Sequence, residues 1–224
     1  MKKLLFTILI IPSLGAFAQD LNMDQIKKMS KDYKRHYGIK AGYNYAKVTG
    51  STPDFHPKSN NGFFVSGFMA PASRGGFGFR SEIIYSKQGF SFDASGKMNN
   101  ITQEYIYLPQ LTTFTIAKKL QLQAGGQMGY LVNAKQGSPD NSSSQNSSAQ
   151  VMDYFNRIDY GAAAGIEVYP VKQVIIGARY NVSLGNIYKR QTTAPTGFPS
   201  PFPFNPNDFK GKNAVVQLFL GVKL

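Results

Sequence analysis

Two histidines limit the acid–base and nucleophilic chemistry that this sequence can support. His56 lies between Pro53 and Pro57, close to Asp54 and several serines, so a Ser/His/acid arrangement can be drawn there. A histidine in a polar segment bounded by prolines is more often simply solvated. His36 lies in a lysine-rich segment near the N-terminus. We therefore expect a protein that is not an enzyme and has no catalytic residues.

The sequence also offers little for metal or cofactor chemistry. It contains no cysteine, which excludes thiolate ligands and disulfides. The spacing of its His, Asp and Glu residues does not resemble a metal site, and no glycine-rich phosphate loop opens a helix. The expectation is a protein without a metal ion or a cofactor.

Five charged residues stand out because they lie at alternate positions within apolar stretches: Arg80, Glu82, Asp159, Glu167 and Arg179. Alternate residues share one face of a strand. In a structural interpretation, these charges pair with one another inside a barrel. In a functional one, they line a polar path for a small solute. Eight strands leave an interior only wide enough for side chains, which favours the structural interpretation.

These charges belong to eight stretches in which apolar and polar residues alternate, as in a strand with two different faces. In the last stretch, Leu218, Leu220 and Val222 share one face, while Gln217 and Lys223 share the other. All but the second stretch comfortably exceed the about 9 to 11 residues that a tilted membrane-spanning strand needs. The predicted strands cover residues 37–48, 62–70, 77–92, 102–116, 120–132, 152–169, 173–188 and 213–224.

The composition of the polar face distinguishes a membrane barrel from a soluble one. A soluble barrel of the lipocalin type has the same alternation, with its apolar face turned inward. In the sixth stretch, however, the polar face carries Gly161, Ala163 and Gly165, which suit a narrow interior better than a surface in water. We therefore predict an all-β fold, an eight-stranded antiparallel up-and-down transmembrane β-barrel.

The connections between the stretches predict an orientation. Those after the second, fourth and sixth stretches are tight, at residues 71–76, 117–119 and 170–172, and the other four are expected to be long. Outer-membrane barrels keep short turns in the periplasm and long loops outside. Both termini are therefore predicted to be periplasmic.

The first 18 residues predict a cleavable export signal. Lys2 and Lys3 precede an apolar run at residues 4–11, and Ala16 and Ala18 form a small-residue cleavage site. The expected organisation is a signal peptide at 1–18, a charged periplasmic tail at 19–36 and an outer-membrane barrel at 37–224. No stretch approaches the roughly 18 to 20 apolar residues of a membrane-spanning helix.

The chain is strongly basic, with a formal charge of +13, and removal of Lys2 and Lys3 with the signal leaves +11. The basic residues are scattered over the tail, turns and loops, and the chain is exported, so nucleic acid is excluded as a partner. Outer-membrane lipid and the phosphates of lipopolysaccharide are the expected counter-charges.

The segment 189–212 is a candidate contact surface because it combines prolines with apolar side chains. It holds five of the twelve prolines. Proline keeps such a segment extended and out of a sheet. Four phenylalanines lie among or beside these prolines, Phe198, Phe202, Phe204 and Phe209. They either contact another envelope protein or fold over the barrel mouth as a lid.

Several motifs, taken in order, resemble the PorT-like outer-membrane β-barrel family of the Bacteroidota. They are EIIYSKQG at 82–89, YLPQL at 107–111, GQMGYL at 126–131, GARYN at 177–181, NI at 186–187 and the ending GVKL at 221–224. The resemblance covers nearly all of the chain from residue 37 onward. It implies an eight-stranded barrel in the outer membrane of a Gram-negative bacterium, and it brings no catalytic residues with it.

Three classes of function follow from these expectations. The first is a non-enzymatic, monomeric barrel with a structural or interaction role, which includes service as an accessory to an envelope or secretion complex. The second is a narrow, porin-like channel or a carrier of small hydrophobic molecules. The third, a lipid-modifying barrel enzyme, has the least support, because it needs a nucleophile or base at the outer membrane interface.

Overall fold

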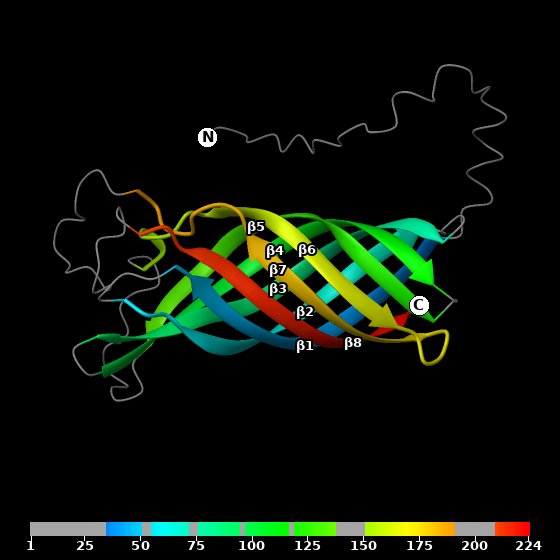
Figure 1. Ribbon diagram of the computed structural model, residues 1–224, viewed down its shortest axis with the longest axis horizontal. Helices are drawn as coiled ribbons and strands as arrows, with labels where there is room; N and C mark the ends of the chain where they lie inside the picture. Colours follow the sequence, from blue (N-terminus) through cyan, green and yellow to red (C-terminus); the bar gives the residue numbers. More distant parts are fainter. Residues whose placement is uncertain are drawn as a thin grey trace, which may run out of the picture. The chain divides into compact units, whose positions relative to one another are not determined.

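Eight strands form a closed barrel in the computed structural model, which describes residues 35–50, 55–71, 76–94, 97–116, 119–137, 151–190 and 209–224. The strands are β1 (Arg35–Thr49), β2 (Lys58–Pro71), β3 (Phe77–Ala94), β4 (Lys97–Ile116), β5 (Leu120–Gly137), β6 (Ile158–Val168), β7 (Val174–Ser183) and β8 (Lys212–Lys223). Each pairs antiparallel with the next, and β8 closes the ring against β1 (Figure 1). The predicted fold class is confirmed.

The N-terminal strand starts slightly earlier than expected. β1 begins at Arg35, so His36, which we assigned to the charged tail, is instead paired with Ala70 of β2. The predicted signal peptide and the rest of the predicted tail lie outside the described residues. None of the described residues forms a helix that is long and apolar enough to cross a bilayer.

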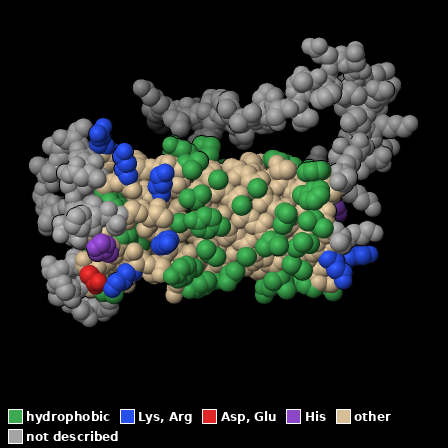
Figure 2. Space-filling model, in the orientation of Figure 1, with side chains coloured by type: hydrophobic (Ala, Val, Ile, Leu, Met, Phe, Trp, Pro, Cys, Tyr) green, Lys and Arg blue, Asp and Glu red, His purple; other side chains and the backbone are tan. Residues whose placement is uncertain are grey.

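The two faces of the strands have the predicted characters. In β7, Arg179 and Asn181 are buried, whereas Tyr180 between them is 48% exposed. In β8, Gln217 is buried and Leu218 is 55% exposed. On the side of the barrel shown in Figure 2, apolar side chains cover the middle and basic ones gather towards the two ends. A polar inner face and an apolar outer face are what a barrel in lipid requires.

The two ends of the barrel differ. One end, the turn end, carries the connections at 72–76, 117–119 and 169–173 together with the first and last strand residues. There the backbone N–H of Leu224 donates to the carbonyl of Tyr37 at 2.9 Å. The opposite end, the loop end, carries the other four connections, at 50–57, 95–96, 138–157 and 184–211.

One of the four connections predicted to be long is in fact short. β3 continues to Ala94 and β4 starts at Lys97, so only residues 95 and 96 separate them. Inward positions at the two boundaries are apolar and fully buried: Phe92 is the last residue of the predicted third strand, and Ile101 lies just before the predicted start of the fourth. The β3–β4 hairpin therefore projects further at the loop end than the sequence pattern indicated.

β6 and β7 are shorter at the loop end than predicted. β6 starts at Ile158 rather than near residue 152, and β7 ends at Ser183 rather than near residue 188. The residues beyond them pair with each other instead: Asn156 N–H donates to Ile187 O at 2.8 Å, and Lys189 N–H donates to Tyr154 O at 2.9 Å. This local pairing brings buried aromatic side chains over the barrel mouth.

Candidate functional site: the filled lumen

The lumen near the turn end holds a buried pair of opposite charges contributed by facing strands. Arg179 of β7 donates from Nη1 to Glu82 Oε2 and from Nη2 to Glu82 Oε1, both at 2.9 Å. Both side chains are at most 1% exposed. Arg80, two residues before Glu82 on β3, donates from Nη1 to Glu167 Oε1 at 2.6 Å. Four of the five charged residues singled out in the sequence therefore lie together.

Lys40 of β1 completes this group, although the sequence analysis did not include it. Its Nζ donates to Glu82 Oε1 and lies 3.3 Å from Glu167 Oε1, so it joins the two carboxylates. The signal that could have identified it is its position: Lys40 and Asn44 share the inward face of their strand, and both are buried. We call these five residues the charge cluster: Lys40, Arg80, Glu82, Glu167 and Arg179.

Neutral polar side chains surround the charge cluster. Arg80 Nη2 donates to Gln121 Oε1 at 2.7 Å, and Arg179 Nη2 donates to Gln123 Oε1 at 3.1 Å. The hydroxyl of Tyr169 donates to Glu167 Oε2 at 2.6 Å. Charged groups taken out of water need such additional partners to offset the cost of desolvation. The cluster is therefore bonded across the lumen on several sides.

Two phenylalanine rings pack against the cations. Lys40 Nζ lies 4.9 Å from the centroid of Phe219, and Arg80 Cζ lies 4.6 Å from the centroid of Phe68. The rings fit because glycines lie beneath them: a Cβ at Gly38 would lie 2.3 Å from Phe68, and one at Gly177 would lie 2.5 Å from Phe219. Cations over ring faces gain further stabilisation in a site away from water.

Asp159, the fifth predicted charge, does not join the cluster. It lies eight residues from Glu167 on β6, about 26 Å along the strand at the usual rise per residue. It accepts hydrogen bonds from Ser183 Oγ at 2.6 Å and from the Tyr107 hydroxyl at 3.0 Å. The prediction of one network was wrong for Asp159, because alternation gives the face of a residue but not its depth in the barrel.

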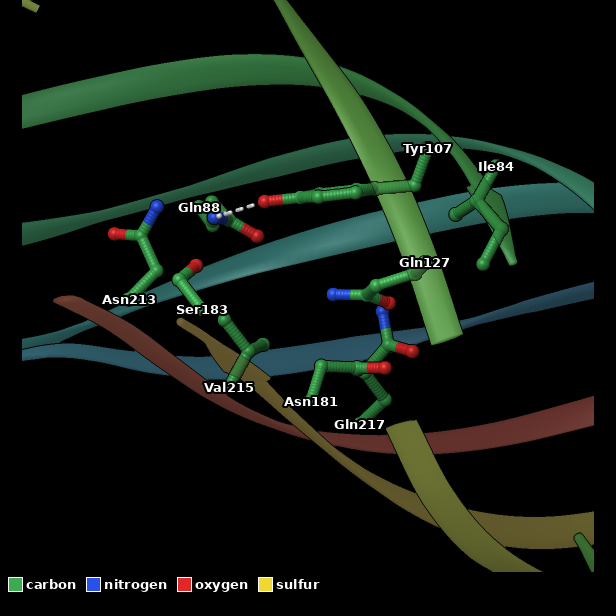
Figure 3. A pocket seen from close by; sticks show the side chains of 9 residues that line it. All are labelled: Ile84, Gln88, Tyr107, Gln127, Asn181, Ser183, Asn213, Val215 and Gln217. Atoms are coloured by element: carbon green, nitrogen blue, oxygen red, sulfur yellow. Dashed lines mark hydrogen bonds between the residues drawn. The ribbon is translucent and has the colours of Figure 1, made fainter. Parts of the chain in front are cut away.

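A small polar cavity lies between the charge cluster and Asp159. It measures about 10 Å³, and its lining includes Gln127 of β5, Asn181 of β7 and Gln217 of β8. Figure 3 shows these three carboxamides on one side of the cavity, with Tyr107 and the remaining lining residues around the rest. Asn181 Oδ1 and Gln217 Oε1 are buried and have no hydrogen-bond partner among the described residues. We call these three carboxamides the amide layer.

Aromatic side chains fill the lumen at the loop end. Phe55 lies at centroid distances of 5.6 Å from Phe92 and 5.1 Å from Phe209, and Phe209 lies 5.4 Å from Tyr188. All four are at most 2% exposed. Burial raises the pKa of the Tyr188 hydroxyl well above its usual value. We call these four residues, with Phe90 and Phe155, the aromatic plug.

The aromatic plug includes one residue of the predicted contact loop. Phe209 is buried within the plug and is not available to a partner, which corrects that part of the prediction. It is buried because it lies in the segment that leads into β8 at Lys212 and packs against Phe55 and Tyr188. Phe198, Phe202 and Phe204 lie outside the described residues. His56, the histidine with catalytic potential, is exposed at the loop end, and Asp54 beside it lies outside the described residues.

No group of three or more His, Cys, Asp or Glu side chains suited to a metal ion is found in the part of the chain that the structure describes. The buried carboxylates of Glu82 and Glu167 are each engaged by two or more donors instead. The cations and carboxylates of the charge cluster neutralise one another across the barrel. Their chemical role in this arrangement is to stabilise a polar interior.

The solved structures that align with this chain include three proteins of Gram-negative bacteria. Neisserial surface protein A aligns with a TM-score of 0.51 at 13% identity, over 84% of this chain and 97% of its own. OprG of Pseudomonas aeruginosa aligns with a TM-score of 0.47 at 10% identity, over 86% and 97%. Ail of Yersinia pestis aligns with a TM-score of 0.45 at 16% identity, over 85% and 99%. The first of these shows a shared fold.

Comparison with curated proteins gives no match. A family model described as the outer membrane protein beta-barrel domain matches residues 17–189, which is more than half of the chain. That match agrees with the closed ring of eight antiparallel strands and with the apolar outer face. The chain belongs to the outer membrane protein beta-barrel domain family.

Proposed function

We propose that this outer-membrane protein is a non-enzymatic barrel whose filled lumen serves as structure and whose loop end contacts other components of the envelope. The observation that carries the proposal is the filling of the described lumen: the charge cluster, the amide layer and the aromatic plug follow one another along it. The space among the amides measures only about 10 Å³, roughly the volume that one water molecule occupies.

The packing of the lumen is most informative about one alternative function, a porin-like channel. Passage of a solute would require the Arg179–Glu82 and Arg80–Glu167 ion pairs to separate in a site where each side chain is at most 2% exposed. Removing one member of a buried pair costs about 3 to 5 kcal/mol, and separation in place leaves both charges uncompensated. These contacts favour a structural role for the cluster over conduction.

A carrier of small hydrophobic molecules gains limited support from the outer wall. A hollow of about 830 Å³ lies over Ala41 and Gly67, where small outward side chains are flanked by Ile39, Ile83 and Leu220. It opens on the lipid-facing surface rather than on the lumen, so membrane lipid itself can fill it. We therefore retain the structural and interaction role.

The proposed placement in the envelope follows from the two different ends. We assign the turn end, with both chain ends of the barrel, to the periplasm and the loop end to the cell exterior. Export by a cleavable signal at 1–18 and membership of the PorT-like barrels of the Bacteroidota are part of the same proposal. It includes service as an accessory to an envelope or secretion complex and a monomeric barrel in contact with lipopolysaccharide.

Two measurements on the full chain test this function. Reconstituted in planar bilayers beside a known porin, the protein should give no stepwise conductance. In intact cells, photo-crosslinkers at Asp93 and Lys135 of the loop end should capture envelope components that crosslinkers at Lys119 and Lys172 of the turn end do not. Stepwise conductance from the wild-type protein would overturn the filled-lumen proposal, and identical crosslinks from both ends would overturn the role of the loop end.

A further inference from the structure

Basic side chains dominate the loop end among the described residues. Nine lysines and arginines whose side chains the structure describes lie there, eight of them exposed: Lys47, Lys58, Lys87, Lys135, Arg157, Lys189, Arg190, Lys210 and Lys212. The described acidic residues at this end that reach the surface are Asp93, Glu104 and Asp153. Such an excess attracts anions, and its geometry decides which kind of anion fits.

Two of these lysines, Lys47 of β1 and Lys212 of β8, form a pair across adjacent strands. Lys47 faces Ala214 and Lys212 faces Thr49 in the β1–β8 register. The two lysines are thus diagonal neighbours, whose Cα atoms in such a pairing are about 7 to 8 Å apart. Their ammonium groups, on long flexible side chains, can both reach one anion placed between them.

The lysine pair has no counter-charge within the described part of the chain. Neither residue forms an ion pair there, whereas the Nζ of exposed Lys58 lies 2.9 Å from Asp93 Oδ2. Like charges directly opposite each other destabilise a strand pair, and these two lysines, as diagonal neighbours, repel one another more weakly. An anion shared by both would remove that repulsion.

The position of the lysine pair in the barrel wall identifies the anion. Tyr45 and Tyr180 both pair with Val216, and all three side chains point outward, at 49%, 48% and 39% exposed. Outward tyrosines mark the border of the hydrocarbon layer in membrane barrels. Lys47 is the next outward residue after Tyr45, and Lys212 has the same outward parity, so the lysine pair lies at the level of the lipid headgroups.

We propose that Lys47 and Lys212 together bind a phosphate group of a membrane lipid in the leaflet at the loop end. This inference rests on the proposed function, in whose orientation that leaflet is the outer one and the lipid is a phosphorylated lipopolysaccharide. Lysine binds phosphate as a compact point charge and does not need the planar geometry of arginine. An acidic protein approaching from outside fits less well, because the lysines project from the lipid-facing wall.

The test is binding of purified lipopolysaccharide to the full chain in nanodiscs of uncharged lipid, measured at low and at physiological salt. We expect the double variant Lys47→Gln/Lys212→Gln to bind about 25-fold more weakly, since each lysine near an anionic surface contributes about fivefold. The variant Lys47→Arg/Lys212→Arg should keep most of the affinity. The matched control Lys119→Gln/Lys172→Gln removes two exposed lysines from the turn end and should change nothing.

Two further arms identify the source of the phosphate. Enzymatically dephosphorylated lipopolysaccharide should bind wild type no better than the intact lipid binds the double glutamine variant. Inorganic phosphate should not displace the lipid at comparable concentrations, and displacement would show a site for free phosphate instead. Heat-modifiable gel mobility of every variant confirms that the barrel is folded.

The inference is overturned if the double glutamine variant binds intact lipopolysaccharide as wild type does, or if dephosphorylation has no effect. It is also overturned if the double glutamine variant still binds the lipid but loses a crosslink to an acidic envelope protein that the wild type forms. These outcomes leave the filled-lumen function standing. Conductance of the wild-type protein, in contrast, would contradict the filled-lumen function and would leave the binding of phosphate by the lysine pair unaffected.

Discussion

Arg179 and Glu82 are joined by two parallel hydrogen bonds of 2.9 Å each, which link β7 to β3 across the lumen. The two residues are 97 positions apart in the chain and at most 1% exposed. A bidentate contact fixes both distance and direction, so it holds the two walls of the barrel at one separation. The pair therefore specifies the register of both strands as well as neutralising charge.

Glu82→Gln should destabilise the barrel by about 3 to 5 kcal/mol, because it leaves three buried cations against the single carboxylate of Glu167. The measurement is urea-induced unfolding in lipid vesicles, followed by the heat-modifiable gel band. The matched control is Lys58→Gln, which breaks the Lys58–Asp93 pair. Both of those side chains are 55% exposed, so the loss should stay below about 1 kcal/mol. Equal losses for the two variants would contradict a buried structural cluster.

Gly177→Ala should cost about 1 to 3 kcal/mol of unfolding free energy, because the new methyl group would lie 2.5 Å from the Phe219 ring. The control is Gly126→Ala, where the nearest atom to the new Cβ is 3.9 Å away, and this variant should be close to neutral. The double variant Gly177→Ala/Phe219→Leu should recover part of the loss. Without that recovery, the ring contact is not the cause.

Phe55→Ala should lower the unfolding free energy by about 3 to 5 kcal/mol, since Phe55 is fully buried among the rings of the aromatic plug. The same variant should remain non-conducting in planar bilayers, because the charge cluster and the amide layer still fill the lumen below. Measuring stability and conductance on one preparation separates the two roles. A conducting Phe55→Ala barrel would show that the plug alone closes the lumen.

A single ordered water molecule should occupy the cavity of the amide layer. The cavity of about 10 Å³ is polar, and Asn181 Oδ1 and Gln217 Oε1 at its wall have no partner among the described residues. Crystallographic density at hydrogen-bonding distance from both oxygens is the expected observation. An empty cavity, or carboxamides rotated to bond each other directly, would contradict it.

The two-residue period of the strands predicted which charges face inward, because a slip by one position would turn Arg179 towards lipid. It did not predict which charges meet, since that depends on the stagger between strands around the ring. The period also places Lys40 on the inward face, but it does not show that Lys40 meets Glu82 and Glu167, which come from β3 and β6. Asp159 was grouped with the others for the same reason.

The strand boundaries at the loop end were harder to predict, because contacts with other segments decide where each strand stops. Phe92, itself part of the aromatic plug, and Ile101 belong to one buried cluster with aromatic residues from the loops, and this cluster supports the extended β3–β4 hairpin. The residues after Ser183 leave the strand because Asn156 and Tyr154 offer them other hydrogen-bond partners. Such contacts arise only after the chain has folded, and no local pattern of residue types encodes them.

The charge cluster also constrains how the protein enters its membrane. Lys40 is 127 positions from Glu167, and these partners lie on β1 and β6, so no single hairpin contains both. A hairpin inserted alone would carry unpaired charges into hydrocarbon, at a cost of about 2 to 4 kcal/mol for each lysine or arginine at mid-bilayer. Insertion strand by strand is thus penalised, and the barrier falls only when distant strands arrive together. Assembly into the bilayer should therefore be concerted, with ring closure as its committing step.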